Sequence, residues 1–142
     1  MINATELKPS SKYIEQIKEM DNDLFDRPWS EKSWSNILTN ENYSTFILLD
    51  HESLIGFSVF FLPNKESQAH LLKIFILKSY RSKGYSKLLL FPELALSSIY
   101  LEVDTKNLAA RKFYQKHGFF LLEITRNYYS DGSDAAKMIK KF

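Results

Sequence analysis

The sequence predicts a mixed α/β fold, a mostly antiparallel sheet flanked by helices in the order β-αα-βββ-α-β-α-ββ. Short apolar runs rich in Ile, Leu and Phe recur along the chain and are typical of strands rather than helices. Between them lie segments with apolar residues at helical spacing, preceded by residues that can cap a helix. Three central strands with short connections predict an antiparallel meander.

The N-terminal part predicts one strand and two helices. Residues 1–7 are expected to form an edge strand, and Ser10 or Ser11 can cap the first helix. That helix carries four apolar residues on one face: Tyr13, Ile14, Ile17 and Met20. We expect a polar break over residues 21–28.

Ser30 is a good N-cap for the second helix, which we expect over residues 31–38. Its apolar face would direct Trp34, Ile37 and Leu38 inward, and residues 40–42 would end it. Apolar strands follow at residues 43–49 and 54–62, joined by a turn at 50–53. A further turn at residues 63–67 leads to a strand at 70–77.

A basic turn follows the apolar run from Leu71 to Leu77. Its sequence, residues 81–87, is RSKGYSK. Gly84 permits a positive φ or a close approach of the backbone to a ligand. The first amides of the next helix lack intrahelical partners, and Arg81, Lys83 and Lys87 add positive charge, so phosphate or pyrophosphate is the simplest ligand.

A basic loop with one glycine before a helix is, taken alone, more often just a solvated loop than a phosphate site. This turn lacks G-x-G-x-x-G and G-x-x-x-x-G-K-S/T, which excludes a dinucleotide-binding fold and a P-loop nucleotidase. Pro92 lies inside the following helix or ends it, and it would cost about 3 kcal/mol if it were truly interior.

The C-terminal part predicts a strand at residues 98–103 and a helix at 108–117. Asn107 is a natural N-cap for that helix, and Gly118 is the expected left-handed residue after its end. Two final strands, at residues 119–126 and 135–140, would surround a polar loop at 127–134.

Length and composition restrict the class of protein. The chain of 142 residues predicts a single domain over residues 1–142. Its net charge of +2 does not argue for nucleic acid, and no apolar run approaches the roughly 18 residues that a membrane span needs. Cysteine is absent, which fits a reducing, cytoplasmic location. His51, His70 and His117 lack ligand spacing, so we expect surface or packing residues and no metal.

Several motifs together resemble one family. Residues 81–86, RSKGYS, resemble the Q/R-x-x-G-x-G/A motif that follows the fourth strand of GNAT-superfamily N-acetyltransferases, with Ser86 in place of Gly or Ala. The segments PWSEK (28–32), LEV (101–103), NLAA (107–110), FYQKHGF (113–119) and RNYY with DG and DA (126–135) resemble the ribosomal-protein-alanine N-acetyltransferases, the RimI-like subgroup. These matches are collinear from about Pro28 to Met138. Relative to this family the chain is several residues short between Leu90 and Leu101, where it carries Pro92, so the resemblance implies that the helix after the basic turn is abbreviated.

The resemblance implies acetyl-CoA as cosubstrate, and it implies roles for particular residues. Glu102 would be the general base, working through water, and Tyr114 the general acid near the thiol sulfur. Ile74, Phe75 and Ile76 would pair with the pantetheine arm like an added strand, an amide near Ile76 would contact the acetyl carbonyl, and Asn107 would hold the arm. The pyrophosphate would be bound by Arg81, Ser82, Lys83, Gly84, Tyr85, Ser86 and Lys87. The peptide amine would bind near Phe25, Trp29, Tyr128 and Tyr129.

The residues alone leave other interpretations open. Glu102 alternates with Leu101 and Val103, which is typical of a solvent-facing strand residue. Tyr114 could be core, and Asn107 could be only a cap. The aromatic residues Trp29, Trp34, Tyr128 and Tyr129 could be core or could line a peptide groove.

We therefore predict an acetyl-CoA-dependent N-acetyltransferase that acts on a protein N-terminal α-amine by direct transfer in a ternary complex. A ribosomal protein is a candidate acceptor, and neither nucleic acid nor membrane is an expected partner. One alternative is an acetyltransferase of a small-molecule amine. The other is a catalytically silent CoA-binding or interaction module, which Ser86 and the shortened helix would favour.

Overall fold

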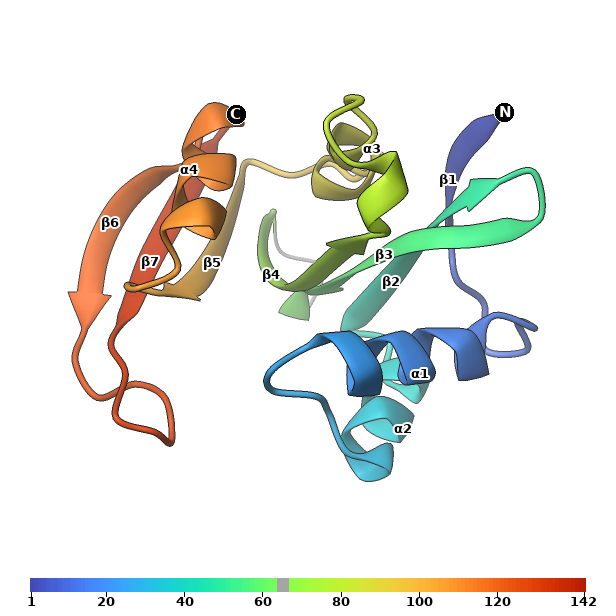
Figure 1. The fold of residues 1–142 in the computed structure, drawn as a ribbon, viewed down its shortest axis with the longest axis horizontal. Helices are drawn as coiled ribbons and strands as arrows, with labels where there is room; N and C mark the ends of the chain where they lie inside the picture. The colour runs from blue at the N-terminus through green and yellow to red at the C-terminus, as the bar shows by residue number, and fades with distance from the viewer. Residues whose placement is uncertain (64–66) are drawn as a thin grey trace.

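The computed structural model describes residues 1–63 and 67–142. Its centre is a seven-stranded sheet in the order β1-β2-β3-β4-β5-β7-β6 (Figure 1). The strands are β1 (Ile2–Glu6), β2 (Tyr43–Asp50), β3 (Ser53–Phe61), β4 (Gln68–Ile76), β5 (Ser98–Asp104), β6 (Phe120–Thr125) and β7 (Ala135–Lys141). The helices are α1 (Ile14–Leu24), α2 (Glu31–Thr39), α3 (Ser86–Leu90) and α4 (Leu108–Lys116), with a short 3-10 turn η2 (Lys78–Tyr80). The element order predicted from the sequence is confirmed. The expected turn at 63–67 includes residues 64–66, which lie outside the described residues.

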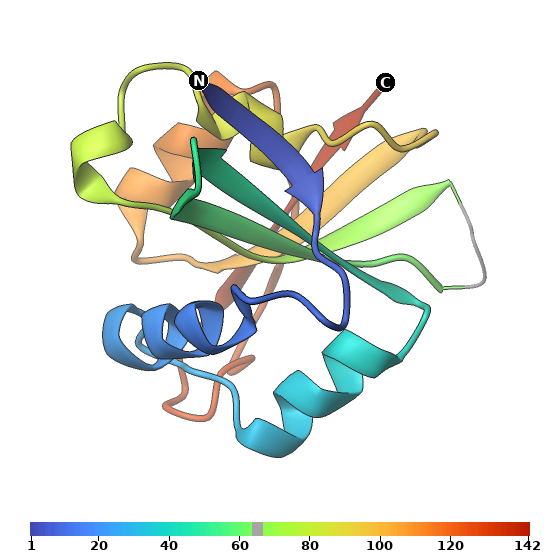
Figure 2. The same cartoon turned by 90° about the vertical axis from the view of Figure 1, so that its right-hand side faces the viewer.

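The helices cover the two faces of the sheet in pairs (Figure 2). Helices α1 and α2 bury Ile17, Trp34 and Ile37 against one face, over Phe57 and Val59 of β3. On the other face, α3 contributes its buried leucines, and α4 packs three partly buried residues, Ala110, Phe113 and Tyr114. Each helix therefore contributes its apolar side to one of two cores that the sheet separates.

Strands β4 and β5 form a fork. All other neighbouring strands are antiparallel, whereas β4 and β5 run parallel and pair only over residues 68–70 and 98–100. Beyond these residues the two strands diverge (Figure 1), while β4 continues along β3 to Ile76. The edge of β4 that faces away from β3 is thus left uncovered by β5 over residues 71–76.

The expected polar break at residues 21–28 was wrong in its first part. Helix α1 continues through Asp21 to Leu24, and Asp21 is fully buried. Asp21 lies seven positions after Ile14 and four after Ile17, on the apolar face of the helix. The expected serine cap was also wrong. The N-cap residue is Tyr13, and Ser11 Oγ instead accepts a hydrogen bond from the Tyr13 amide at 3.1 Å.

Burial of Asp21 is possible because its carboxylate is fully partnered. It forms an ion pair with Lys73 of β4, and it accepts hydrogen bonds from Trp34 Nε1 at 2.9 Å and from the Trp29 amide at 2.8 Å. Lys73 Nζ also donates to the carbonyl of Arg27 at 3.1 Å. Burial lowers the pKa of Lys73, and the hydrogen bond from its ammonium to Asp21 opposes that shift. The pair fixes α1 and the segment after it to β4.

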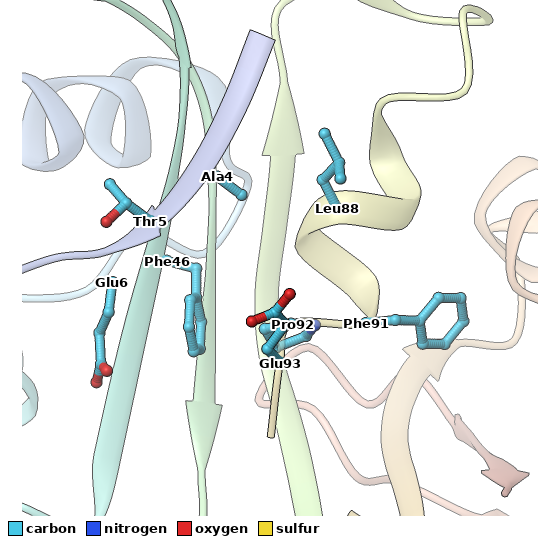
Figure 3. Close-up of a pocket in the computed structure, with 8 residues that line it drawn as sticks. All are labelled: Ala4, Thr5, Glu6, Phe46, Leu88, Phe91, Pro92 and Glu93. Atoms are coloured by element: carbon cyan, nitrogen blue, oxygen red, sulfur yellow. The ribbon is translucent and has the colours of Figure 1, made fainter. Parts of the chain in front are cut away.

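Helix α3 is short, as the sequence predicted. It ends at Leu90, and Pro92 follows two residues later, where a proline cannot continue the helix. A pocket of about 410 Å³ lies beside α3 and opens toward the edge strand β1 (Figure 3). It is lined by Ala4, Thr5, Glu6, Phe46, Leu88, Phe91, Pro92 and Glu93.

The buried ion pair generates a test of stability. We expect Asp21→Asn to lower the free energy of unfolding by about 3–5 kcal/mol, because it leaves the Lys73 ammonium buried without a counter-charge. Adding Lys73→Met should restore most of the loss, since the introduced amide oxygen can still accept from the two tryptophans. Urea denaturation of the single and double variants measures this.

The matched control is Glu31→Gln, which removes an exposed carboxylate from its ion pair with Lys18. Its effect should stay below about 1 kcal/mol. A double variant as unstable as Asp21→Asn would contradict the assignment of the loss to an uncompensated charge.

Candidate active site

A pocket of about 710 Å³ opens at the fork, between β4, the basic turn and α4. On the β4 side and along the turn it is lined by Ile74, Phe75, Ile76, Tyr80, Arg81, Ser82, Gly84, Tyr85, Ser86 and Lys87. On the α4 side it is lined by Ala109, Ala110, Phe113, Tyr114, Lys116 and His117. One wall is thus the free edge of a strand, and the opposite wall is a helix.

The basic turn has an unusual backbone. Gly84 has φ +83°, as the sequence predicted, and Ser82 has φ +62°, which the sequence did not indicate. A Cβ at Gly84 would meet nothing within 4 Å, so the glycine is required by its backbone angle and not by close approach. Arg81 Nε donates to the Ile76 carbonyl at 2.8 Å, which ties the turn back to the end of β4.

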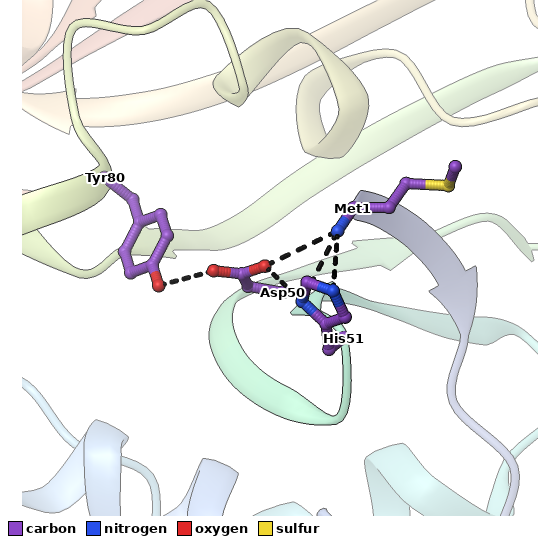
Figure 4. A network of polar contacts seen from close by, with 4 residues as sticks. All are labelled: Met1, Asp50, His51 and Tyr80. Atoms are coloured by element: carbon purple, nitrogen blue, oxygen red, sulfur yellow. Dashed lines mark hydrogen bonds and ion pairs between the residues drawn. The ribbon is translucent and has the colours of Figure 1, made fainter.

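Tyr80 fixes the start of the turn to a neighbouring part of the sheet (Figure 4). Its hydroxyl donates to Asp50 at 2.7 Å, and Asp50 also lies 3.0 Å from His51 Nδ1 and 3.8 Å from the N-terminal ammonium of Met1. The hydrogen bond from Tyr80, followed by that from His51, lowers the pKa of Asp50, and the same bond to Asp50 raises the pKa of Tyr80. The turn is therefore anchored to the β2–β3 end of the sheet.

Tyr114 lies on α4 at the pocket wall. Asn107 caps this helix by accepting from the Ala110 amide at 3.1 Å, as predicted. The Tyr114 ring packs edge-on against Phe113 and Phe119, at centroid distances of 5.2 and 5.6 Å. Burial, with a smaller contribution from Tyr129, raises the pKa of Tyr114 to about 12. Its phenol therefore remains protonated at any ordinary assay pH.

Glu102 lies on the opposite face of the sheet, close to His70. The side chains of His70 and Glu102 form a hydrogen bond between His70 Nε2 and Glu102 Oε2. The His70 ring stacks on Tyr100, with centroids 4.4 Å apart and an interplanar angle of 14°. His70 packs on Tyr100, as a packing residue would, and its polar atom also contacts the predicted base.

Two loops flank Glu102 on this face. Arg27, in the segment between α1 and α2, reaches Asp131 at 3.1 Å and Asp104 at 3.8 Å. Its guanidinium also lies 4.0 Å from the ring centroid of Tyr129, and the Tyr128 and Tyr129 rings meet edge-on at 5.0 Å. Arg27 thus joins the α1–α2 segment to the β6–β7 loop beside Glu102.

The predicted acceptor residues Phe25 and Trp29 are partly buried. Lys73 Nζ lies 4.2 Å from the Trp29 ring and 4.7 Å from the Phe25 ring. Trp29 also packs edge-on against Trp34 at 4.8 Å, and Phe25 packs against Phe57 and Phe75. These partly exposed rings therefore pack against the core beneath α1 and α2.

The structure brings most of the predicted cofactor residues into one pocket. Lys83 and Asn107 are not among the residues that line it, and Glu102 lies on the other face. The sequence reasoning missed Asp21, Lys73 and His70. A signal existed for the first two, because each is a charged residue within an apolar pattern, and their charges are opposite.

Comparison with known proteins agrees with this architecture. Residues 14–119 match the model of the acetyltransferase (GNAT) family. The chain is 31% identical over 122 residues to the [ribosomal protein bS18]-alanine N-acetyltransferase of Haemophilus influenzae, covering 82% of this chain and 81% of that protein.

Two solved structures extend the comparison. The crystal structure of the Escherichia coli ribosomal-protein-S18-alanine N-acetyltransferase superposes with a TM-score of 0.83 at 27% identity, covering 99% of this chain and 94% of that one. Arabidopsis thaliana Naa50, in complex with the bisubstrate analogue CoA-Ac-MVNAL, gives a TM-score of 0.80 at 24% identity, covering 99% of each chain, which shows the shared fold.

A forked α/β sheet with a pocket at the fork thus defines the class as an acyl-CoA-dependent transferase. The chain belongs to the acetyltransferase (GNAT) family. It is an acetyl-CoA-dependent N-acetyltransferase. Within residues 1–63 and 67–142, no group of acidic, His or Cys side chains could hold a metal ion. No helix in that part of the chain is long and apolar enough to cross a membrane.

Proposed function

We propose that this protein transfers the acetyl group of acetyl-CoA to the α-amine at the N-terminus of a protein, by direct transfer in a ternary complex. The main observation in support of this proposal is the fork between β4 and β5. It is bordered by a large pocket with a basic turn on one side and by a carboxylate between two aromatic loops on the other. Such an arrangement lets two substrates approach one point from opposite faces of a sheet.

The pocket residues are suited to hold acetyl-CoA. The uncovered edge of β4 at residues 74–76 offers backbone amide and carbonyl groups to the pantetheine arm, and an amide near Ile76 would contact the acetyl carbonyl. The turn with Ser82 and Gly84 at positive φ presents successive backbone amides, and Lys83 and Lys87 add charge for a pyrophosphate. When bound, acetyl-CoA supplies the activated thioester.

Glu102 is the proposed general base. An α-amine has a reference pKa of about 7.7–8.0, against about 10.4 for a lysine side chain, so a carboxylate base can deprotonate it near neutral pH. The side chain of Glu102 is only 18% exposed and lies near Tyr128 and Tyr129 of the loop 127–134. Tyr128 and Tyr129 on that loop offer an apolar surface with polar hydroxyls to the first residues of a peptide.

Tyr114 is the proposed general acid. Its hydroxyl lies at the pocket wall, and its raised pKa keeps the phenol protonated until the thiolate departs. Asn107, which caps α4, would fix the helix that carries this hydroxyl and hold the arm of the cosubstrate.

A panel of acceptors tests the proposed function. The relative from Haemophilus influenzae is named for an alanine on ribosomal protein bS18, so peptides of that kind are the first acceptors to try. Thiol release should be measured with N-terminal peptides that begin with Ala, Ser or Met, with the same peptides blocked at the α-amine, and with polyamines. Turnover that requires a free α-amine supports the proposal. Turnover of polyamines alone, or binding of CoA without turnover, would contradict it.

The turn gives a prediction for cosubstrate binding. We expect Gly84→Val to weaken acetyl-CoA binding at least tenfold, about 1.4 kcal/mol. The reason is conformational, since a β-branched residue disfavours φ +83° and would reorient the amides of the turn. Isothermal titration calorimetry measures the affinity.

Gly132→Val provides the matched control. Gly132 has φ +87° and equally open surroundings, but it lies in the β6–β7 loop, outside the acetyl-CoA pocket. It should strain the backbone similarly and leave acetyl-CoA affinity unchanged. Equal affinities for Gly84→Val and the unmodified protein would remove the basis for the pyrophosphate assignment.

The acid role gives a second prediction. Tyr114→Phe keeps the ring among Phe113 and Phe119 and removes only the proton donor. We expect kcat to fall roughly 10²-fold, with acetyl-CoA affinity little changed. Steady-state thiol release measures kcat, and Tyr43→Phe, at a tyrosine outside the pocket, is the control. A loss of stability with kcat preserved would show instead that Tyr114 is only a core residue.

A further inference from the structure

We propose that His70 is a positioning residue for Glu102, and that the two side chains act as one proton-accepting pair whose working pH is set by the imidazole. The inference rests on the proposed function, because it requires Glu102 to receive the proton of the acceptor amine.

The pair lies where the fork begins. His70 is the last residue of β4 that pairs with β5, opposite Tyr100, and Glu102 lies two positions further along β5 on the same face. The side chains are 19% and 18% exposed, and His70 Nε2 contacts Glu102 Oε2 directly. The contact therefore joins the two arms of the fork at the point where they begin to diverge.

The surroundings fix the ring of His70. Tyr100 stacks on it, and Lys137 Nζ lies 4.6 Å from the Tyr100 ring. Lys137 is also the residue of β7 directly opposite Glu102. An ionised carboxylate can only accept hydrogen bonds, so Nε2 of a neutral His70 carries the hydrogen and donates it to Glu102. One carboxylate oxygen is thereby committed to the imidazole, which orients the other.

Other charged and titratable groups near the pair have partners of their own. Asp104 on β5 lies 3.8 Å from the Arg27 guanidinium of the α1–α2 segment, and Lys73, further along β4, is paired with Asp21. From β3, His70 faces the uncharged Phe61.

Glu123 of β6 lies opposite Lys137 in the sheet. Two further groups come from the β6–β7 loop. The pKa values of Tyr128 and Tyr129 are raised, mainly by burial and also by the negative charge of Glu102. Both phenols are therefore neutral near pH 7. His70 is thus the imidazole that contacts Glu102 directly.

The proton balance of the step is simple. With neutral His70 the pair carries one negative charge. The bond between nitrogen and hydrogen in the acceptor ammonium breaks, the proton passes to Glu102 directly or through water, and the pair becomes neutral. The amine nitrogen keeps the electron pair with which it attacks the thioester carbonyl. After transfer the pair returns the proton to solvent.

Protonation of the His70 imidazole would stop Glu102 from acting as a base. When the imidazole is protonated, its positive charge lowers the proton affinity of Glu102, so the carboxylate no longer takes the proton of the amine. The acidic limb of the pH–rate profile should therefore reflect the pair, as is general for strongly coupled groups, and not an isolated carboxylate.

His70→Gln tests this. Glutamine can still donate a hydrogen bond to Glu102 but cannot hold the extra proton. We expect the midpoint of the acidic limb of kcat/KM to move to lower pH by about 1–2 units, given reference values of about 6.5 for imidazole and about 4.3 for a glutamate. The α-amine of the acceptor peptide has the same pKa in both assays. A difference between the pH–rate profiles of His70→Gln and the unmodified enzyme therefore arises from the enzyme.

His51→Gln is the control, because it makes the same substitution at a histidine whose side chain is 81% exposed and lies at the β2–β3 turn. Its profile should overlay that of the unmodified enzyme. A His70→Gln profile lowered by the same factor at every pH, or unchanged, overturns the inference.

A measurement without turnover separates this inference from the proposed function. In NMR titrations of the imidazole rings, the midpoint for His70 should move to lower pH in Glu102→Gln, because the carboxylate favours the charged imidazole. An unchanged His70 midpoint in Glu102→Gln would contradict the proposal that the two side chains act as a pair. If no peptide is acetylated by the unmodified enzyme, the proposed function fails, and the NMR result still decides whether the pair exists.

Discussion

The parting of β4 and β5 is the constraint on which the rest of this structure depends. Because the two strands pair only over residues 68–70 and 98–100, the sheet has an interior strand edge that a substrate can use. The helices on the two faces then differ in what they support. Helix α4 and the basic turn border the opening on one side, and α1 and α2 support the loop around Glu102 on the other.

Much of this architecture could be predicted from the sequence, because the signals are local. Asn107 caps α4, Ser30 caps α2, and Gly84 and Gly118 adopt positive φ, each as its residue type and position indicated. Pro92 limited α3 in the same way. The motif resemblance added the family, which the comparisons confirmed.

What the sequence did not reveal depends on residues far apart in the chain. Asp21 looked like the start of a polar break because its partner, Lys73, lies 52 positions away. His70 looked unremarkable because the register of β4 against β5, which brings it to Glu102, is set by the whole sheet. Local propensity carries no information about such pairings, and only the charged residues within apolar patterns hinted at one of them.

The ammonium of Lys73, held between the Phe25 and Trp29 rings above Asp21, has a consequence for how this enzyme can change over evolution. Substitutions that reshape the segment 25–29 also disturb a buried charge, so most of them cost stability before they alter acceptor choice. The β6–β7 loop does not hold a comparable buried charge, since its ion pair between Asp131 and Arg27 is exposed. New acceptor preferences in this scaffold should therefore arise mainly from changes in the hairpin loop.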